Sequence, residues 1–145
     1  MPRPTKFRRV EYFPEKTYFI PFGMPKCQVE EVVLKLEELE AMRLKDIEGL
    51  SQEECAEKMH VSRQTFQNII DSARKKVAIA LTEGKAINIS GGHFTSKYCK
   101  MKCLTCGNEY NINYQQDRYT CPECGSKEVL CSRKSGICNK WCGRE

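Results

Sequence analysis

Residues 50–76 read LSQEECAEKMHVSRQTFQNIIDSARKK, and this stretch decides the fold of the first part of the chain. Its apolar residues recur at helical spacing on both sides of the triplet at 59–61, but the spacing breaks across that triplet. The apolar residues are Leu50, Cys55, Ala56, Met59, Val61, Phe66, Ile69, Ile70 and Ala73. The pattern therefore predicts two helices joined by a tight corner.

Polar residues at the expected ends of these helices support the same reading. Ser51 followed by Glu54 forms a capping-box pattern, in which the hydroxyl and the carboxylate each bind an early backbone N–H group. Ser62 can cap the second helix in the same way. The corner residue is His60, where glycine would adopt a positive φ with less strain. We expect the helices to begin at Ser51 and Ser62.

The second helix would carry a row of polar side chains, because positions three and four apart share one face. That row consists of Arg63, Gln64, Gln67, Asn68 and Asp71. Guanidinium and amide groups are the donors and acceptors that read base edges in the DNA major groove. The pattern indicates a helix-turn-helix with the recognition helix second. The alternative is an ordinary helical hairpin whose polar side faces water.

Charge is unevenly distributed, although the net charge is only +5. Residues 1–27 and 61–97 each carry six basic and two acidic residues, whereas residues 28–60 carry four basic and ten acidic ones. This layout predicts a basic face attracted to phosphate, formed by the N-terminal arm and the recognition helix. A mixed solvated surface is the alternative.

The segments around the two helices complete a first domain over residues 1–94. Basic and aromatic residues in 1–27 form two β-prone runs, which predict a small hairpin in a basic N-terminal arm. Residues 29–46 show helical spacing and predict one long helix, or two joined near Lys35. Residues 86–89 predict a short strand added to the hairpin. We expect a mainly α domain with a small β-hairpin.

Three phrases of the sequence identify a resemblance to a known group of proteins. They are LEELEAMRLKDIEGLSQEECAEKMHVSRQTF, SARKKVAIAL and GKAINISGG, together with the leading MPRP and FRRV. Over residues 1–94 the chain resembles a prokaryotic family of small uncharacterised proteins that are predicted to bind DNA. Its helix-turn-helix is similar to region four of sigma factors. The resemblance implies DNA contacts by Arg63, Gln64, Gln67 and Asn68, with Ser62 at a phosphate.

Residues 95–145 hold eight of the ten cysteines and form a predicted second domain. Cys103 and Cys106, and then Cys121 and Cys124, form two CxxC pairs, each followed by glycine. Two such turns facing each other give a closed site of four thiolates, which suits structural zinc. β-Prone residues at 109–114 and 118–120 indicate the strands of a small zinc ribbon. A domain of about 50 residues needs such a staple, because it cannot bury enough apolar surface.

The remaining cysteines leave the metal chemistry open. Cys99, Cys131, Cys138 and Cys142 could form a second metal site, although their spacing matches no familiar pattern. An iron–sulfur cluster is an alternative to zinc, since thiolates bind both. His93 is a lone candidate ligand and is expected at the surface, while Cys27 and Cys55 are expected to be buried.

These features predict a sequence-specific DNA-binding protein, a transcriptional regulator with double-stranded DNA as its partner. Two alternatives remain: a metal or redox sensor, and a ribbon module that binds RNA or RNA polymerase. Dimers are common for this motif, but no heptad repeat supplies one. The sequence shows no enzyme signature, because no nucleophile has a visible base and no glycine-rich loop cradles phosphate. It also shows no membrane span or secretory signal, so we expect a cytoplasmic location.

Overall fold

The computed structural model describes residues 4–96 and 99–131. The chain divides into two compact units. The helical unit is Tyr12–Gly92, and the cysteine-rich unit contains the described residues on either side of it. The first domain was expected to span residues 1–94. In the structure, residues 4–11 group with the cysteine-rich unit, and the boundary after the helices lies at 92–93.

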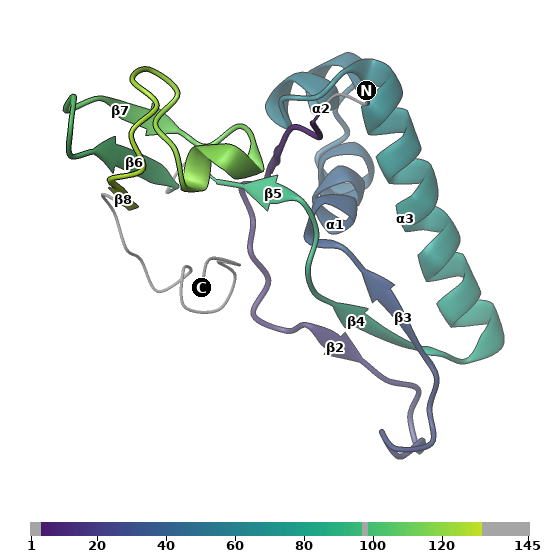
Figure 1. Cartoon of the computed structure of the whole chain (residues 1–145). Coiled ribbons are helices and arrows are strands. Elements are labelled where there is room, and N and C mark those ends of the chain that lie inside the picture. Colours follow the sequence, from purple (N-terminus) through teal and green to yellow (C-terminus); the bar gives the residue numbers. More distant parts are fainter. Residues whose placement is uncertain (1–3, 97–98, 132–145) are drawn as a thin grey trace. The chain divides into compact units, whose positions relative to one another are not determined.

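The helical unit contains three α-helices in the described part of the chain (Figure 1). Helix α1 is Leu36–Met42, and it continues as a wider π-helical turn at Arg43–Ile47. Helix α2 is Gln52–Lys58, and the long helix α3 is Arg63–Glu83. Gly84 ends α3 in the left-handed conformation with φ 68°, which glycine adopts without a Cβ clash. The two helices expected from residues 50–76 are therefore present.

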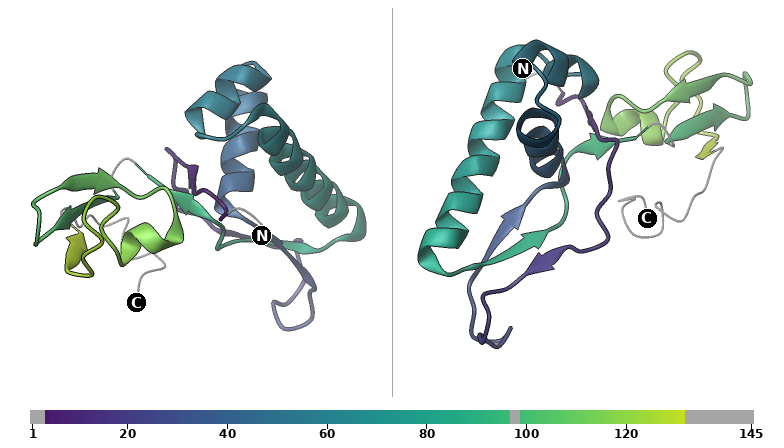
Figure 2. Two further views of the ribbon diagram at one scale, coloured as in Figure 1. Left: turned by 45° about the horizontal axis from the view of Figure 1, so that its top comes forward. Right: turned by 180° about the vertical axis from the view of Figure 1, so that it is seen from behind.

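A three-stranded sheet lies near the C-terminal end of α3, away from α2, and its strand order is β2-β4-β3 (Figures 1 and 2). Strand β2 (Tyr18–Phe19) is antiparallel to β4 (Ala86–Ile89), and β4 is parallel to β3 (Glu31–Leu34). Two parallel neighbours need a long crossover connection. In this unit all three helices form that crossover, since they lie between β3 and β4 in the chain.

The helices enclose a small apolar core. Phe66 is completely buried and lies on α3, where it packs with Ala56 and Met59 from the end of α2. The small side chain of Ala56 allows α2 and α3 to approach each other closely. The buried members of the cluster are Ala41, Leu44, Cys55, Ala56, Met59, Phe66, Ile69 and Ile70. This packing fixes which face of α3 remains exposed.

Two expectations for this region are wrong. Residues 31–34 form a strand instead of the start of a long helix, because Val32 and Val33 pair with β4 residues more than fifty positions later. Helix α1 begins only after Lys35, whose backbone N–H donates to the Glu38 carboxylate at 2.9 Å. The expected N-terminal hairpin does not form either, since its two runs join different sheets. The strand expected at residues 86–89 is present, but it pairs with β2 and β3.

The cysteine-rich unit is built on a three-stranded antiparallel sheet with order β7-β6-β8. These strands are β6 (Lys100–Cys103), β7 (Glu109–Asn111) and β8 (Val129–Cys131). A second pair of strands is parallel and joins β1 (Arg8–Arg9) to β5 (Phe94–Thr95). The N-terminal segment thus pairs with residues that follow the helical unit in sequence.

Phe7 anchors the N-terminal segment in the core of the cysteine-rich unit. Its ring is 3% exposed and stacks on His93 at a centroid distance of 4.2 Å, and its N–H donates to Asn113. The core contains Phe7, Met101, Cys103, Ile112, Cys121 and Val129. The first run expected as a strand forms β7 only as far as Asn111, and the run expected at 118–120 forms no strand. A 3₁₀ turn at Gln115–Arg118 lies between β7 and the end of that second run.

A buried carboxylate ties α1 to α3. Glu38 accepts hydrogen bonds from Ser72 at 2.5 Å and from the Lys76 ammonium at 2.7 Å, and its side chain is 5% exposed. Burial alone would raise the pKa of Glu38, but the hydrogen bonds from Lys76, Ser72 and Lys35 together lower it. The ionised form of Glu38 therefore stabilises the folded helical unit.

We expect this contribution to disappear in acid. Because the folded state lowers the pKa of Glu38, its stabilisation is complete above the unfolded pKa of about 4.3 and is lost as pH falls through the folded pKa. Glu38→Gln should cost about 1–3 kcal/mol at pH 7. That difference should shrink below about pH 4.3. Urea unfolding followed by circular dichroism at several pH values measures it, with the exposed Glu57→Gln as the control.

Candidate functional site

The corner between α2 and α3 is set by backbone hydrogen bonds. His60 donates to the Glu57 carbonyl and Val61 donates to the Ala56 carbonyl, which is the Schellman pattern of a helix end. The residue between these bonds must be left-handed, and His60 has φ 56°. It is the non-glycine residue with positive φ among those that the structure describes. The chain turns within four residues and starts α3 at once.

Both predicted serine caps are present. The Ser51 hydroxyl accepts from the Glu54 N–H at 3.1 Å, and the Ser62 hydroxyl accepts from the Thr65 N–H at 3.1 Å. The Ser62 hydroxyl also donates to the Thr65 side chain at 2.9 Å. Ser62 thus holds the first turn of α3 while its own side chain stays at the surface.

The structure brings the predicted polar row together on the N-terminal half of α3. Arg63, Gln64 and Asn68 are exposed, and Gln67 is partly buried. Phe66, on the opposite face of the same turn, is completely buried. The helix therefore separates a polar surface from the core within a few residues.

Hydrogen bonds cross from α2 to this row through Gln52, a residue for which the sequence predicted no role. The Arg63 Nε donates to the side-chain Oε1 of Gln52 at 3.1 Å, and the side-chain Nε2 of Gln52 donates to the side-chain Oε1 of Gln67. The Gln67 amide then donates to Asp71 at 2.8 Å. This chain, the Arg63–Gln52–Gln67–Asp71 brace, fixes the side chains of the row. A polar residue at the first helical position of α2 was the available signal.

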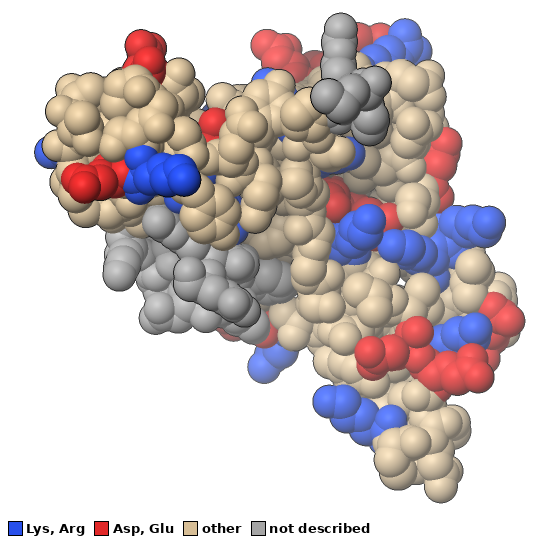
Figure 3. Space-filling view, viewed as in Figure 1, with Lys and Arg blue, Asp and Glu red and all other residues tan. Residues whose placement is uncertain are grey.

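Basic residues of α3 pair with acidic residues that precede the helix. Arg63 lies 3.3 Å from Glu53, and Arg74 lies 2.5 Å from Asp46. On the face shown in Figure 3, basic and acidic side chains are interspersed over the helical unit. The expected separation into one basic and one acidic face is thus reduced by local pairing. Exposed pairs of this kind contribute about 0–1 kcal/mol each and exchange readily for other partners.

The second candidate site is the cluster of Cys103, Cys106, Cys121 and Cys124. Their four Sγ atoms all lie within 4.8 Å of one another. The Sγ atoms of Cys103 and Cys124 are 3.6 Å apart, and those of Cys106 and Cys121 are 3.7 Å apart. A tetrahedral ion with bonds of about 2.3 Å to sulfur places its ligands about 3.8 Å apart. These four residues lie close enough to hold a metal ion, as the spacing predicted.

The two CxxC turns share one backbone pattern. Gly107 donates its N–H to the Cys103 carbonyl at 3.0 Å, and Gly125 donates to the Cys121 carbonyl at 2.9 Å. Both glycines have φ 76°, a conformation that disfavours any side chain. Cys103 and Cys121 also each donate their own N–H to the carbonyl five residues later. The cluster therefore has two equivalent halves, each a short loop that holds two sulfurs.

Backbone N–H groups prepare the first cysteine of each loop to be a thiolate. The N–H groups of Cys106 and then Thr105 lower the pKa of Cys103 to about 6, against the opposing effect of burial. The pKa of Cys121 is lowered by the N–H groups of Cys124 and Glu123 in the same manner. Four sulfurs this close cannot all be charged without a cation, because their mutual repulsion favours protons on some of them.

The other candidate ligands are distributed as follows. Cys99 and Cys131 are partly buried against the core of the cysteine-rich unit, and Cys138 and Cys142 lie outside the described residues. Cys55 is buried as expected, but Cys27 is exposed because it lies in the loop between β2 and β3. His93 stacks on Phe7, and its Nε2 lies 2.7 Å from the Thr5 carbonyl.

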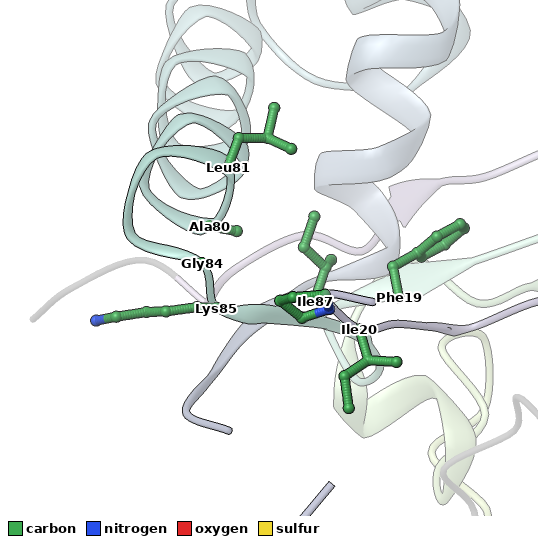
Figure 4. A pocket seen from close by; sticks show the side chains of 8 residues that line it. Phe19, Ile20, Ala80, Leu81, Gly84, Lys85 and Ile87 are labelled. Carbon is green, nitrogen blue, oxygen red and sulfur yellow. The ribbon is translucent and has the colours of Figure 1, made fainter. Parts of the chain in front are cut away.

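Hollows are present at the surface of the helical unit. One, of about 500 Å³, adjoins the π-helical turn and is lined by Tyr12, Leu39, Met42, Arg43, Asp46, Ile47 and Glu48. Another, of about 240 Å³, lies where α3 meets the sheet, and its lining includes Phe19, Ile20, Leu81 and Ile87 (Figure 4). Lys85 also borders this second hollow, but its ammonium lies 3.4 Å from Glu30.

A membrane span needs a helix that is both long and apolar. Among the described residues, no helix meets both requirements.

Comparisons with known proteins assign the chain to a family. Residues 1–97 match the family described as "Protein of unknown function DUF134". A "UPF0251 protein" of Clostridium botulinum (strain Loch Maree / Type A3) is 72% identical over 142 residues, covering 98% of this chain and 90% of the relative. A "UPF0251 protein" of Clostridium tetani is 73% identical, covering 98% and 97%. No solved structure matches. The chain belongs to the DUF134 family, also called UPF0251, whose names state no function.

Proposed function

We propose that the protein binds double-stranded DNA through a helix-turn-helix made of α2 and α3, and that it acts as a sequence-specific transcriptional regulator. The observation that carries this proposal is the polar row on α3. Gln64 and Asn68 are exposed opposite the buried Phe66, and Arg63 is exposed at the first position of α3. A helix with a buried back and an exposed front of guanidinium and amide groups fits the major groove.

The start of α3 supplies contacts of a different kind. Ser62 caps a helix whose first N–H groups lie at the protein surface, and a helix N-terminus attracts negatively charged phosphate. Arg63 uses Nε and one terminal nitrogen within the protein, which leaves further N–H groups on its guanidinium. We assign Ser62 to a phosphate and Arg63 to the groove edge. The tight corner at His60 leaves the N-terminal end of α3 exposed at the surface.

For the cysteine cluster we propose a structural zinc ion in a zinc ribbon. Four thiolates leave no open position for water, so such an ion shapes the unit instead of catalysing a reaction. Two of the sulfur separations, 3.6 and 3.7 Å, are close to the value of about 3.8 Å expected around one tetrahedral ion, whereas an iron–sulfur cluster would hold its four ligands further apart. Metal analysis of the purified chain distinguishes zinc from iron directly.

The DNA proposal is tested with a library of duplexes containing a random central segment. The affinity of the wild-type protein for the selected sequences is measured at one fixed salt concentration, because phosphate contacts make affinity salt-dependent. Arg63→Ala and Gln64→Ala should each weaken binding to the selected duplex by about 1–3 kcal/mol, without changing thermal unfolding. Gln28→Ala removes an exposed side chain elsewhere in the helical unit and should leave binding unchanged.

Two results would contradict the proposal. The first is a wild-type protein that selects no sequence and binds duplex DNA no better than structured RNA at equal salt, which would favour an RNA-binding module. The second is unchanged affinity and sequence preference in both alanine variants. A DNA affinity that responds to chelation or oxidation would instead support a sensor role for the cysteine cluster.

A further inference from the structure

The polar row on α3 contains two hydrogen-bonded groups with different arrangements. The side-chain oxygen of Gln67 accepts from Gln52 and its side-chain nitrogen donates to Asp71, so this side chain is held within the Arg63–Gln52–Gln67–Asp71 brace. Gln64 and Asn68 lie outside the brace and bind each other, with the Gln64 amide nitrogen donating to the Asn68 carbonyl oxygen at 3.1 Å. The row therefore divides into a braced part and an exposed pair.

The exposed pair leaves a defined set of atoms for a ligand. With one hydrogen bond made inside the pair, the Gln64 carbonyl oxygen and the Asn68 amino group remain toward solvent. Exchanging oxygen and nitrogen in both amides would reverse the internal bond but would still leave one carbonyl oxygen and one amino group. The pair thus offers one acceptor and one donor side by side, whichever way the two amides are oriented.

We propose that Gln64 and Asn68 act together as a reader of adenine in the major groove. Adenine presents an N6 amino donor beside the N7 acceptor, which matches one carbonyl and one amino group. Guanine presents two acceptors, O6 and N7, so the carbonyl of the pair would face another acceptor. This inference rests on the proposed DNA binding and adds the base that is recognised.

The brace explains why the pair can discriminate. Free glutamine and asparagine side chains lose rotamer freedom when they bind, which reduces the net gain from each contact. The bond between Gln64 and Asn68 already restricts both side chains, and the brace holds the neighbouring Arg63 and Gln67 away from the same space. A donor and an acceptor fixed in advance distinguish bases better than mobile ones.

Base selection by variants tests the assignment. The random duplex library is selected with the wild type, Gln64→Ala, Asn68→Ala and Gln64→Arg. The position read by the pair is the one whose preference is lost in both alanine variants, and we expect adenine there in the wild-type motif. Gln64→Arg should change that base to guanine, because arginine pairs with O6 and N7, while the other positions are kept.

Single-atom changes in the selected duplex give a second readout. At the position read by the pair, 7-deazaadenine removes N7, and purine removes the N6 amino group. Each should weaken wild-type binding by about five- to a hundredfold and should weaken Asn68→Ala much less. Gln28→Arg is the matched control, since it adds the same charge in the loop at the opposite end of α3 (Figure 1). It should leave the motif unchanged.

The outcomes separate this inference from the proposed function. A wild-type protein that selects no motif overturns both. A clear motif whose position read by the pair is a G·C pair, or a motif that Gln64→Arg leaves unchanged, overturns only the adenine assignment. Equal binding of the adenine and 7-deazaadenine duplexes overturns it as well. All variants change exposed side chains, so thermal unfolding should match the wild type and exclude misfolding as the cause.

Discussion

Cys121→Ala is expected to abolish metal binding and to unfold the cysteine-rich unit while the helical unit stays folded. Cys121 is 1% exposed and is both one of the four clustered sulfurs and a member of the core. A structural zinc ion contributes about 10–16 kcal/mol to small domains, which is comparable to the whole stability of a domain. The loss should therefore remove the fold of this unit outright.

Two measurements on the full chain report the effect of Cys121→Ala. Elemental analysis should show metal in the wild type and its loss in the variant, and amide NMR spectra should lose dispersion for the cysteine-rich unit alone. Cys27→Ala is the matched control, because Cys27 is an exposed thiol in the helical unit. It should keep both the metal and the spectrum. Unchanged metal content and dispersion in Cys121→Ala would refute the assignment of the cluster as a metal centre.

Phe66→Ala is expected to have the largest effect in the helical unit. The ring is 0% exposed and packs against α2 residues on one side of α3. Removing a buried phenylalanine costs about 3–5 kcal/mol, since the surrounding side chains only partly fill the cavity. For a unit of this size the unfolding midpoint should fall by about 10 °C or more. Calorimetry and circular dichroism both measure this shift.

Phe22→Ala is the matched control for this change. Phe22 is fully exposed at 107%, so truncating its side chain removes no buried contact. The substitution should change the free energy of unfolding by less than about 0.5 kcal/mol. Because Phe66 lies behind the polar row, Phe66→Ala should also weaken the proposed DNA binding at temperatures near its lowered midpoint. Equal midpoints for the Phe66→Ala and Phe22→Ala proteins would show that the core is wrongly identified.

Local chemistry explains what could be predicted from the sequence. The caps at Ser51 and Ser62 each depend on residues within four positions, and both are present. The four clustered cysteines were also predictable, because each CxxC turn brings its two sulfurs together by itself. His60 was expected to be strained at the corner, and its positive φ confirms this.

Long-range pairing explains what could not be predicted. Val29, Val32, Val33 and Leu36 follow a helical spacing, yet residues 31–34 form a strand. The deciding partner is β4, which lies more than fifty residues away, and local periodicity carries no information about it. Phe7 is a similar case, since its core neighbours come from residues 93 and later. Gln52 was missed because its role depends on the packing of α2 against α3.

The pairing of β1 with β5 has a consequence for how the chain is divided. The helical unit is inserted between two segments that belong to one sheet, so the chain passes from one unit to the other twice, at 11–12 and at 92–93. A single cut in either connection leaves the other covalently intact. A fragment ending at residue 94 would keep Phe7 but lose most of its packing partners, whereas one that starts at Tyr12 and ends at Gly92 separates the units cleanly.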